Sequence, residues 1–136
     1  DGVALIHCTG KFNDPGPQNA WMEKYIFPGA YTPTLSEQFP SIERAKLFVT
    51  DVEILRLHYA ETLKLWREAF EKNRETIASM YDEKFCRMWE FYLAGCETAF
   101  RHGVLMVFQI QLSKSLSTVP LTRDYISDFE KSHFEI

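Results

Sequence analysis

The segment Val3 to Cys8 (VALIHC) is short, almost wholly apolar and flanked by glycines. Such a run predicts a β-strand that is covered on both faces, because a strand with one face in water alternates apolar and polar residues. A strand of this kind requires neighbouring strands and helical layers over its sheet. His7 lies near its carboxyl end, and ligands of open parallel α/β sheets bind just beyond that end.

Two later segments also have the composition of strands. Residues 46–55 (KLFVTDVEIL) are rich in β-branched residues, and residues 104–112 (VLMVFQIQL) alternate apolar residues with Gln109 and Gln111. This alternation predicts that one face of the last strand is polar or partly exposed. Between the strands, apolar residues recur every three or four positions, which predicts helices. They are placed at 20–27, 36–45, 58–73, 75–81 and 83–102, with a possible final turn at 124–130.

Polar residues, prolines and glycines mark the ends of these elements. Asn19 and Asp82 are expected N-caps, and Gly103 is expected to end the longest helix in a left-handed conformation. Residues 9–19 are expected to form a loop, because the motif PGP excludes regular structure. Pro40 is tolerated in a helix only near the first turn.

The chain length and the element order set the fold class. A chain of 136 residues is expected to form one core. The order strand, helices, strand, helices, strand predicts an α/β fold, but three strands are few for this layout and leave the first strand without neighbours. The chain also opens at Asp1 without an initiator methionine. We therefore expect the sheet to continue in sequence outside this chain.

Charge and cysteine content exclude several classes of function. The net charge of −4 argues against nucleic acid as a partner, because phosphate binding requires a basic surface. Neither a run of 18 apolar residues nor a signal-peptide pattern is present, which predicts a cytoplasmic protein. The three cysteines lack CxxC spacing and are expected to be free thiols that bind no metal. The aromatic content of 15% indicates either a ligand pocket or an aromatic core.

Several blocks in a fixed order resemble one family over residues 3–126. These blocks are LIHCTGK, KYIFPGAYTPTLSE, VTDVEILRLHYAETLKLWREAFEKN, YDEKFCRMWEFYLAGCETAFRHG and VFQIQLSK. Together they resemble the C-terminal half of cyclopropane-fatty-acyl-phospholipid synthases, which include the mycolic acid cyclopropane synthases. The resemblance implies a Rossmann-like class I S-adenosylmethionine-dependent methyltransferase sheet, with helical insertions that cover a lipid. The three strands correspond to its fifth, sixth and seventh, the last one antiparallel. Residues 1–136 are then a partial domain whose N-terminal cofactor-binding half is absent.

The resemblance also implies an activity. Members of the family transfer a methylene group from S-adenosylmethionine to a cis double bond of a phospholipid acyl chain, and a bound bicarbonate removes a proton so that the cyclopropane ring closes. Aromatic faces can stabilise the intermediate cation without reacting with it. The implied enzyme is cytoplasmic and peripheral at the membrane, with the missing half or a second copy as a further partner. The alternatives are a lipid C-methyltransferase without ring closure and a non-catalytic lipid-binding remnant.

The resemblance assigns roles to seven residues. His7 and Tyr59 match the residues that hold bicarbonate, and Cys96 matches a cysteine often assigned to the active site. We interpret Cys96 as a wall of the pocket, because the mechanism needs no covalent enzyme intermediate, and Gly95 as a residue that leaves space for the acyl chain. For each of His7, Tyr59 and Cys96 a purely structural role is the alternative. The other matching positions, implied to bind substrate, are Thr9, Phe27, Leu63 and Tyr92.

The sequence departs from the family pattern at three points. The common motif HTIG is HCTG here, so Cys8 and Thr9 replace a threonine and an isoleucine, and IFPGG is IFPGA, with Ala30 in place of a glycine. A Gly-rich loop for the cofactor and the remaining bicarbonate ligands are also missing. We therefore expect the isolated chain to show no measurable binding of S-adenosylmethionine.

Overall fold

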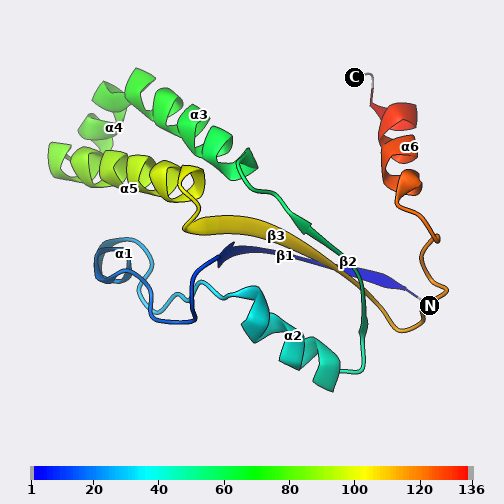
Figure 1. The fold of residues 1–136 in the computed structure, drawn as a ribbon. Helices are drawn as coiled ribbons and strands as arrows, with labels where there is room; N and C mark the ends of the chain where they lie inside the picture. The colour runs from blue at the N-terminus through cyan, green and yellow to red at the C-terminus, as the bar shows by residue number, and fades with distance from the viewer. Residues whose placement is uncertain (1, 135–136) are drawn as a thin grey trace.

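The computed structural model describes residues 2–134 and contains one three-stranded sheet (Figure 1). The strands are β1 (Val3–Lys11), β2 (Phe48–Ile54) and β3 (Leu105–Ser113), in the spatial order β1-β3-β2. The central strand β3 runs antiparallel to both neighbours, as expected for the last strand of the template. In this register Gln109 lies between His7 of β1 and Glu53 of β2.

Six helices accompany the sheet in the described part of the chain, and all lie within a few residues of the predicted ranges. Asn19 and Asp82 accept backbone hydrogen bonds as N-caps, and Gly103 has a φ of 81°, as predicted. Pro40 is the exception, because it lies inside its helix and past the first turn. The helices are α1 (Ala20–Tyr25), α2 (Leu35–Arg44), α3 (His58–Lys72), α4 (Arg74–Met80), α5 (Glu83–Arg101) and α6 (Asp124–His133).

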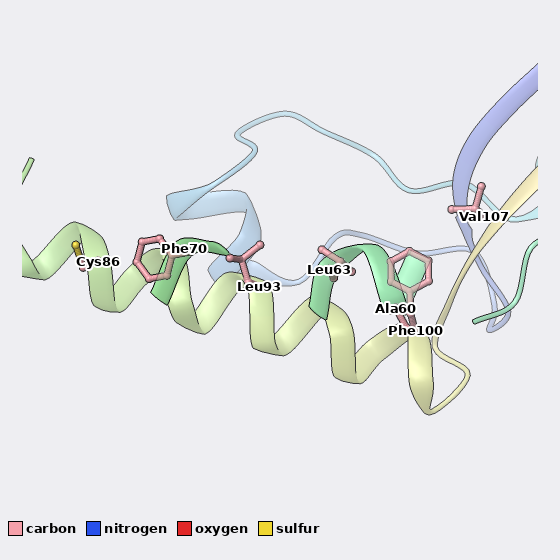
Figure 2. Packing of buried hydrophobic residues seen from close by; sticks show 7 residues of the cluster. All are labelled: Ala60, Leu63, Phe70, Cys86, Leu93, Phe100 and Val107. Carbon is pink, nitrogen blue, oxygen red and sulfur yellow. The ribbon is translucent and has the colours of Figure 1, made fainter. Parts of the chain in front are cut away.

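Helices α3, α4 and α5 gather at one end of the sheet, and α3 packs along α5 (Figure 1). The residues between them form a row that leads to Val107 on β3 (Figure 2). This cluster comprises Ala60, Leu63, Phe70, Cys86, Leu93, Phe100 and Val107. Since these residues come from the apolar stripes of both helices, the long amphipathic pattern that predicted the helices also predicts their packing.

The opposite face of β3 packs against α2. Met106, Phe108, Ile110 and Leu112 alternate along the strand and are buried together with Ile42 of α2. Gly10 of β1 lies on the same face, and a Cβ atom at this position would lie 2.6 Å from the ring of the fully buried Phe108. Glycine is therefore required where β1 passes over this aromatic ring.

The structure corrects two predictions for β1. The strand forms one edge of the sheet, and most of its residues before Gly10 are exposed, including Val3 and Leu5, so it is not covered on both faces. An apolar composition alone cannot show whether neighbouring layers are present in the same chain. The strand also extends to Lys11, so the predicted loop begins later, because Gly10 and Lys11 pair with Met106 and Leu105 of β3.

Ion pairs fix helix α5 to its neighbours. Glu97 pairs with Arg67 of α3 at 3.1 Å and with Arg101 at 2.9 Å, and Arg101 reaches Glu61 of α3. Partial burial opposes the ionisation of Glu97, but hydrogen bonds and charges from Arg101 and Arg67 hold its pKa below the usual range. Helix α5 is therefore held by charges as well as by apolar packing.

Candidate functional site

A cavity of about 420 Å³ lies between the segment after β1, helix α1 and helix α5. Its size falls in the range of small-molecule sites. It is located at the carboxyl end of β1, beside Lys11, and its lining does not include His7 or Thr9. Its lining residues are Lys11, Asn13, Pro17, Gln18, Asn19, Trp21, Met22, Thr32, Phe91, Tyr92, Gly95, Cys96, Ala99, Val104 and Leu105.

One wall of the cavity is a face of helix α5. Tyr92, Gly95, Cys96 and Ala99 line it because residues three and four positions apart lie on the same side of a helix. No atom lies within 4 Å of the position that a Cβ of Gly95 would take, so this glycine leaves open space. Phe27 contacts Tyr92 in an edge-to-face pair with ring centroids 5.9 Å apart. Phe27 therefore lies next to the cavity wall.

Burial keeps both ionisable groups of this wall protonated. It raises the pKa of Cys96 to about 11. It also raises the pKa of Tyr92 to about 12, with smaller contributions from the Cys96 and Tyr59 groups. At neutral pH the wall thus presents a thiol, a phenol and apolar carbon, and no anionic nucleophile.

The raised pKa predicts slow alkylation of Cys96. At pH 8 a thiol of pKa about 11 contains roughly 100-fold less thiolate than one with the ordinary value of 9, and only the thiolate reacts. We expect iodoacetamide to label Cys96 about 100-fold more slowly in the folded than in the denatured chain, with a rate that increases up to about pH 11. Peptide mass spectrometry over time measures this rate. Equal labelling in both states would contradict the raised pKa, and faster labelling in the folded chain would show that Cys96 is an activated thiol.

Tyr59 and Leu63 lie in helix α3, on the other side of α5. Tyr59 is partly buried and packs edge to face with Phe100 at 5.1 Å and with Trp66 at 5.9 Å. Tyr59 and Tyr92 both pack against the buried cluster between α3 and α5. Leu63 is fully buried in the cluster between α3 and α5 and does not line the cavity.

The position of Leu63 predicts a loss of stability on truncation. Leu63→Ala is expected to lower the free energy of unfolding by about 2–5 kcal/mol, because it leaves a void in a packed core. Leu65→Ala is the matched control, since Leu65 is exposed on the same helix and its loss should cost less than about 0.5 kcal/mol. Urea denaturation compares the two variants. Unchanged stability for Leu63→Ala, with weaker acyl-chain binding, would support the substrate-binding role that the resemblance implies.

His7 and Thr9 lie on β1, on the sheet face that also carries Val107 and Gln109. His7 is exposed, and its Nδ1 lies 3.1 Å from Nε2 of Gln109. An amide nitrogen can only donate, so Nδ1 accepts this bond and the proton of the neutral imidazole resides on Nε2. Among the described residues, no hydrogen bond joins His7 to Tyr59 or Cys96.

Sequence reasoning missed three polar residues near these positions. Gln109 orients His7, although its alternation with apolar residues indicated only a polar face. Lys11 and Gln18 line the cavity, although their segment was predicted as an ordinary loop.

No group of three or more His, Cys, Asp or Glu residues suited to a metal ion occurs within residues 2–134. No helix in this same part of the chain is long and apolar enough to cross a bilayer.

The fold is shared with solved methyltransferases. The chain matches the cyclopropane synthase MmaA2 from Mycobacterium tuberculosis with a TM-score of 0.75 and 27% identity, over 82% of this chain and 44% of that one. It matches the mycolic acid cyclopropane synthase CmaA1, complexed with SAH and CTAB, with the same values. These likenesses confirm the predicted α/β class, that of the class I S-adenosylmethionine-dependent methyltransferases.

The sequence comparisons identify the family. The family model described as mycolic acid cyclopropane synthetase matches residues 1–110, and the chain belongs to this family. Tuberculostearic acid methyltransferase UfaA1 of Mycobacterium tuberculosis is 46% identical over 91 residues, which are 65% of this chain and 21% of that protein. A probable fatty acid methyltransferase of Pseudomonas putida is 38% identical over 127 residues, or 90% of this chain and 32% of that protein. The chain thus spans less than half the length of these relatives.

Proposed function

We propose that the protein containing this chain transfers a one-carbon group from S-adenosylmethionine to a cis double bond of a phospholipid acyl chain and closes a cyclopropane ring, with bicarbonate as the base. The observation that carries the proposal is the cavity along α5. Its wall is formed in part by Tyr92, Gly95 and Cys96, and the phenol of Tyr92 and the thiol of Cys96 both keep their protons at neutral pH. The relatives named as fatty acid and mycolic acid enzymes support a lipid substrate. This chain supplies the part of the site that faces the acyl chain.

The side chains of the cavity suit a reaction that passes through a carbocation. Aromatic faces such as those of Tyr92 and Trp21 attract a cation by about 0.5–2 kcal/mol each and form no bond with it. A protonated Cys96 thiol is a weak nucleophile and therefore does not trap the cation. Apolar walls also exclude water, which is the competing nucleophile.

In this proposal His7 is a ligand of bicarbonate, and its hydrogen bond to Gln109 supports that role. Because Nδ1 accepts from Gln109, the N–H of Nε2 is free to donate to an oxyanion. The hydroxyl of Tyr59 is the second donor in the proposal. A base held in this way must come within hydrogen-bond reach of the transferred carbon before it removes the proton.

The residues of this chain do not fit the cofactor by themselves. The segments that follow β1 and β2 contain no Gly-rich nucleotide-binding loop. The cavity is lined mainly by apolar and amide side chains, together with Lys11 and Thr32. S-adenosylmethionine supplies the one-carbon group as a sulfonium methyl when bound. We assign its binding to sequence outside this chain.

A second candidate function is methyl transfer without ring closure. It is favoured by the names of two relatives, the tuberculostearic acid methyltransferase and the probable fatty acid methyltransferase. In this case the cation loses a proton to the base and a branched alkene forms in place of the three-membered ring. A non-catalytic lipid-binding remnant is the remaining alternative.

Mass spectrometry of lipids from cells that express the full-length protein tests the proposal. We expect acyl chains that gain the mass of one methylene group and lose their double bond, with cyclopropane proton signals in the NMR spectrum of the purified lipid. A methyl-branched product would support the second candidate. Lipids identical to those of cells carrying an empty vector would contradict both enzymatic functions.

A further inference from the structure

Lys11 is a buried lysine in the wall of a mainly apolar cavity. Its residue is only 8% exposed, and within residues 2–134 it forms no ion pair. Its Nζ donates to the carbonyl of Gly16 at 2.6 Å and lies 5.4 Å from the ring centroid of Tyr31. An ammonium group has three donors, and buried lysines are rare unless they are paired. The contacts of Lys11 therefore leave donor capacity for a ligand.

The charge of Lys11 lowers the pKa of Glu37, but this carboxylate already accepts hydrogen bonds from other groups. Hydrogen bonds from Tyr31 and Thr34, and to the smallest extent the Lys11 charge, hold the pKa of Glu37 below its usual range. Glu37 also forms a capping box with Thr34 at the start of α2. Glu37 thus belongs to the helix cap, and it forms no ion pair with Lys11 within the described residues.

Gln18 adds a second donor to the same end of the cavity. Its Oε1 accepts from the hydroxyl of Thr32 at 3.4 Å, whereas its buried Nε2 has no hydrogen-bond partner. A buried amide without a partner costs free energy unless a ligand or water satisfies it. Both Lys11 and Gln18 line the cavity, so a ligand in it can reach both.

The side chains of Lys11 and Gln18 both offer hydrogen-bond donors, and the rest of the wall is mainly apolar. Trp21, Met22, Phe91, Tyr92 and Cys96 form the apolar part. A ligand that complements both parts has a hydrocarbon chain and an oxygen acceptor at one end. Lys11 lies four residues beyond His7 on the same face of β1, about 13 Å at 3.3 Å per residue. The polar end is therefore separated from the histidine that faces the proposed reaction.

We propose that Lys11 and Gln18 bind the carbonyl or carboxylate oxygens at the head of the acyl ligand. This inference rests on the proposed function, because it specifies how the acyl ligand is oriented in the same cavity. When the head of the acyl ligand is held at one end of the cavity, the number of carbons between the carbonyl carbon and the double bond determines where the double bond lies. The bound oxygen belongs either to a free carboxylate or to an ester, and binding experiments distinguish these two sources.

Equilibrium binding to the full-length protein tests the inference with three probes of the same chain length. Oleate carries a carboxylate, methyl oleate carries an ester carbonyl, and oleylamine carries a cation. Lys11→Met should weaken oleate binding roughly tenfold and strengthen oleylamine binding, because it removes a charge-assisted hydrogen bond and a positive charge. Lys11→Arg should keep most of the oleate affinity. Lys64→Met is the matched control, since Lys64 is exposed on α3 and away from the cavity.

Gln18→Leu should weaken oleate and methyl oleate binding about threefold to tenfold, because a neutral hydrogen bond contributes less than a charged one.

The Lys11→Met variant distinguishes the two sources of the bound oxygen. If it loses affinity for methyl oleate as well as for oleate, the site binds an ester, and if it loses affinity for oleate alone, the site binds a free fatty acid. Parallel losses for all three probes, oleylamine included, would show a structural role and overturn the inference. Unchanged affinities in both variants would overturn it too. If none of the probes binds the unmodified protein, the proposed acyl cavity itself is wrong.

Discussion

Gly95→Phe is expected to weaken acyl-chain binding about 100-fold while the protein remains folded. The new side chain would project from α5 into the open space of the cavity, where no atom lies within 4 Å of a Cβ at this position. Displacing three or four methylene groups of a ligand costs about 0.8 kcal/mol each, which is roughly a 100-fold loss of affinity. Oleate binding by calorimetry measures this loss.

Two further variants show whether Gly95→Phe weakens binding by filling the cavity or by unfolding the protein. Gly95→Ala should raise the free energy of unfolding by about 0.5–1 kcal/mol, because glycine weakens the middle of a helix. Thr98→Phe adds the same ring to an exposed position of α5 that does not line the cavity, and it should leave oleate affinity unchanged. If Gly95→Phe binds oleate as well as the unmodified protein, the acyl chain lies elsewhere.

His7→Ala is expected to lower turnover of the full-length enzyme by about 100-fold, because it removes a donor to the proposed general base. Tyr59→Phe should act in the same direction. Cys96→Ser should cost less than about tenfold, since it changes only the wall of the cavity and not a reacting group. Lipid product formed per unit time, followed by mass spectrometry, measures all three rates.

The matched control for His7 is His102→Ala, because His102 is an exposed histidine at the end of α5 and is expected to leave turnover unchanged. Gln109→Leu should produce an intermediate loss, since it frees the imidazole to rotate and to change tautomer. A greater loss from Cys96→Ser than from His7→Ala would make the cysteine a catalytic group.

The secondary structure was predictable from local patterns. The apolar stripes of α3 and α5, the caps Asn19 and Asp82, and the glycine at position 103 each act within one or two turns of chain. The exposure of β1 was not predictable in this way, because it depends on which neighbours the chain contains. The interior position of Pro40 likewise depends on where the capping box starts α2.

The candidate site was predictable in part. Tyr92, Gly95 and Cys96 were placed on one inward face by helical spacing, and the structure brings all three to the cavity. Leu63 shares a stripe with Tyr59, but its contacts with α5 could be known only from the packing of the two helices. Lys11 and Gln18 were missed because their segment meets α5 across more than 70 residues of chain, and no local pattern encodes that contact.

The two helices that line the cavity, α5 and α1, differ in how strongly the rest of the structure holds them. Helix α5 is fixed by its buried cluster and by ion pairs to α3, whereas α1 buries none of its residues and contacts α5 through the ring of Trp21 against Phe91. Elements with few buried contacts open at a low free-energy cost. If the proposed function is correct, we expect α1 to move when acyl chains of different length or branching bind, while the side chains of α5 keep their positions. On this proposal, α1 would set the range of acyl chains that bind, and α5 would fix the geometry of the site.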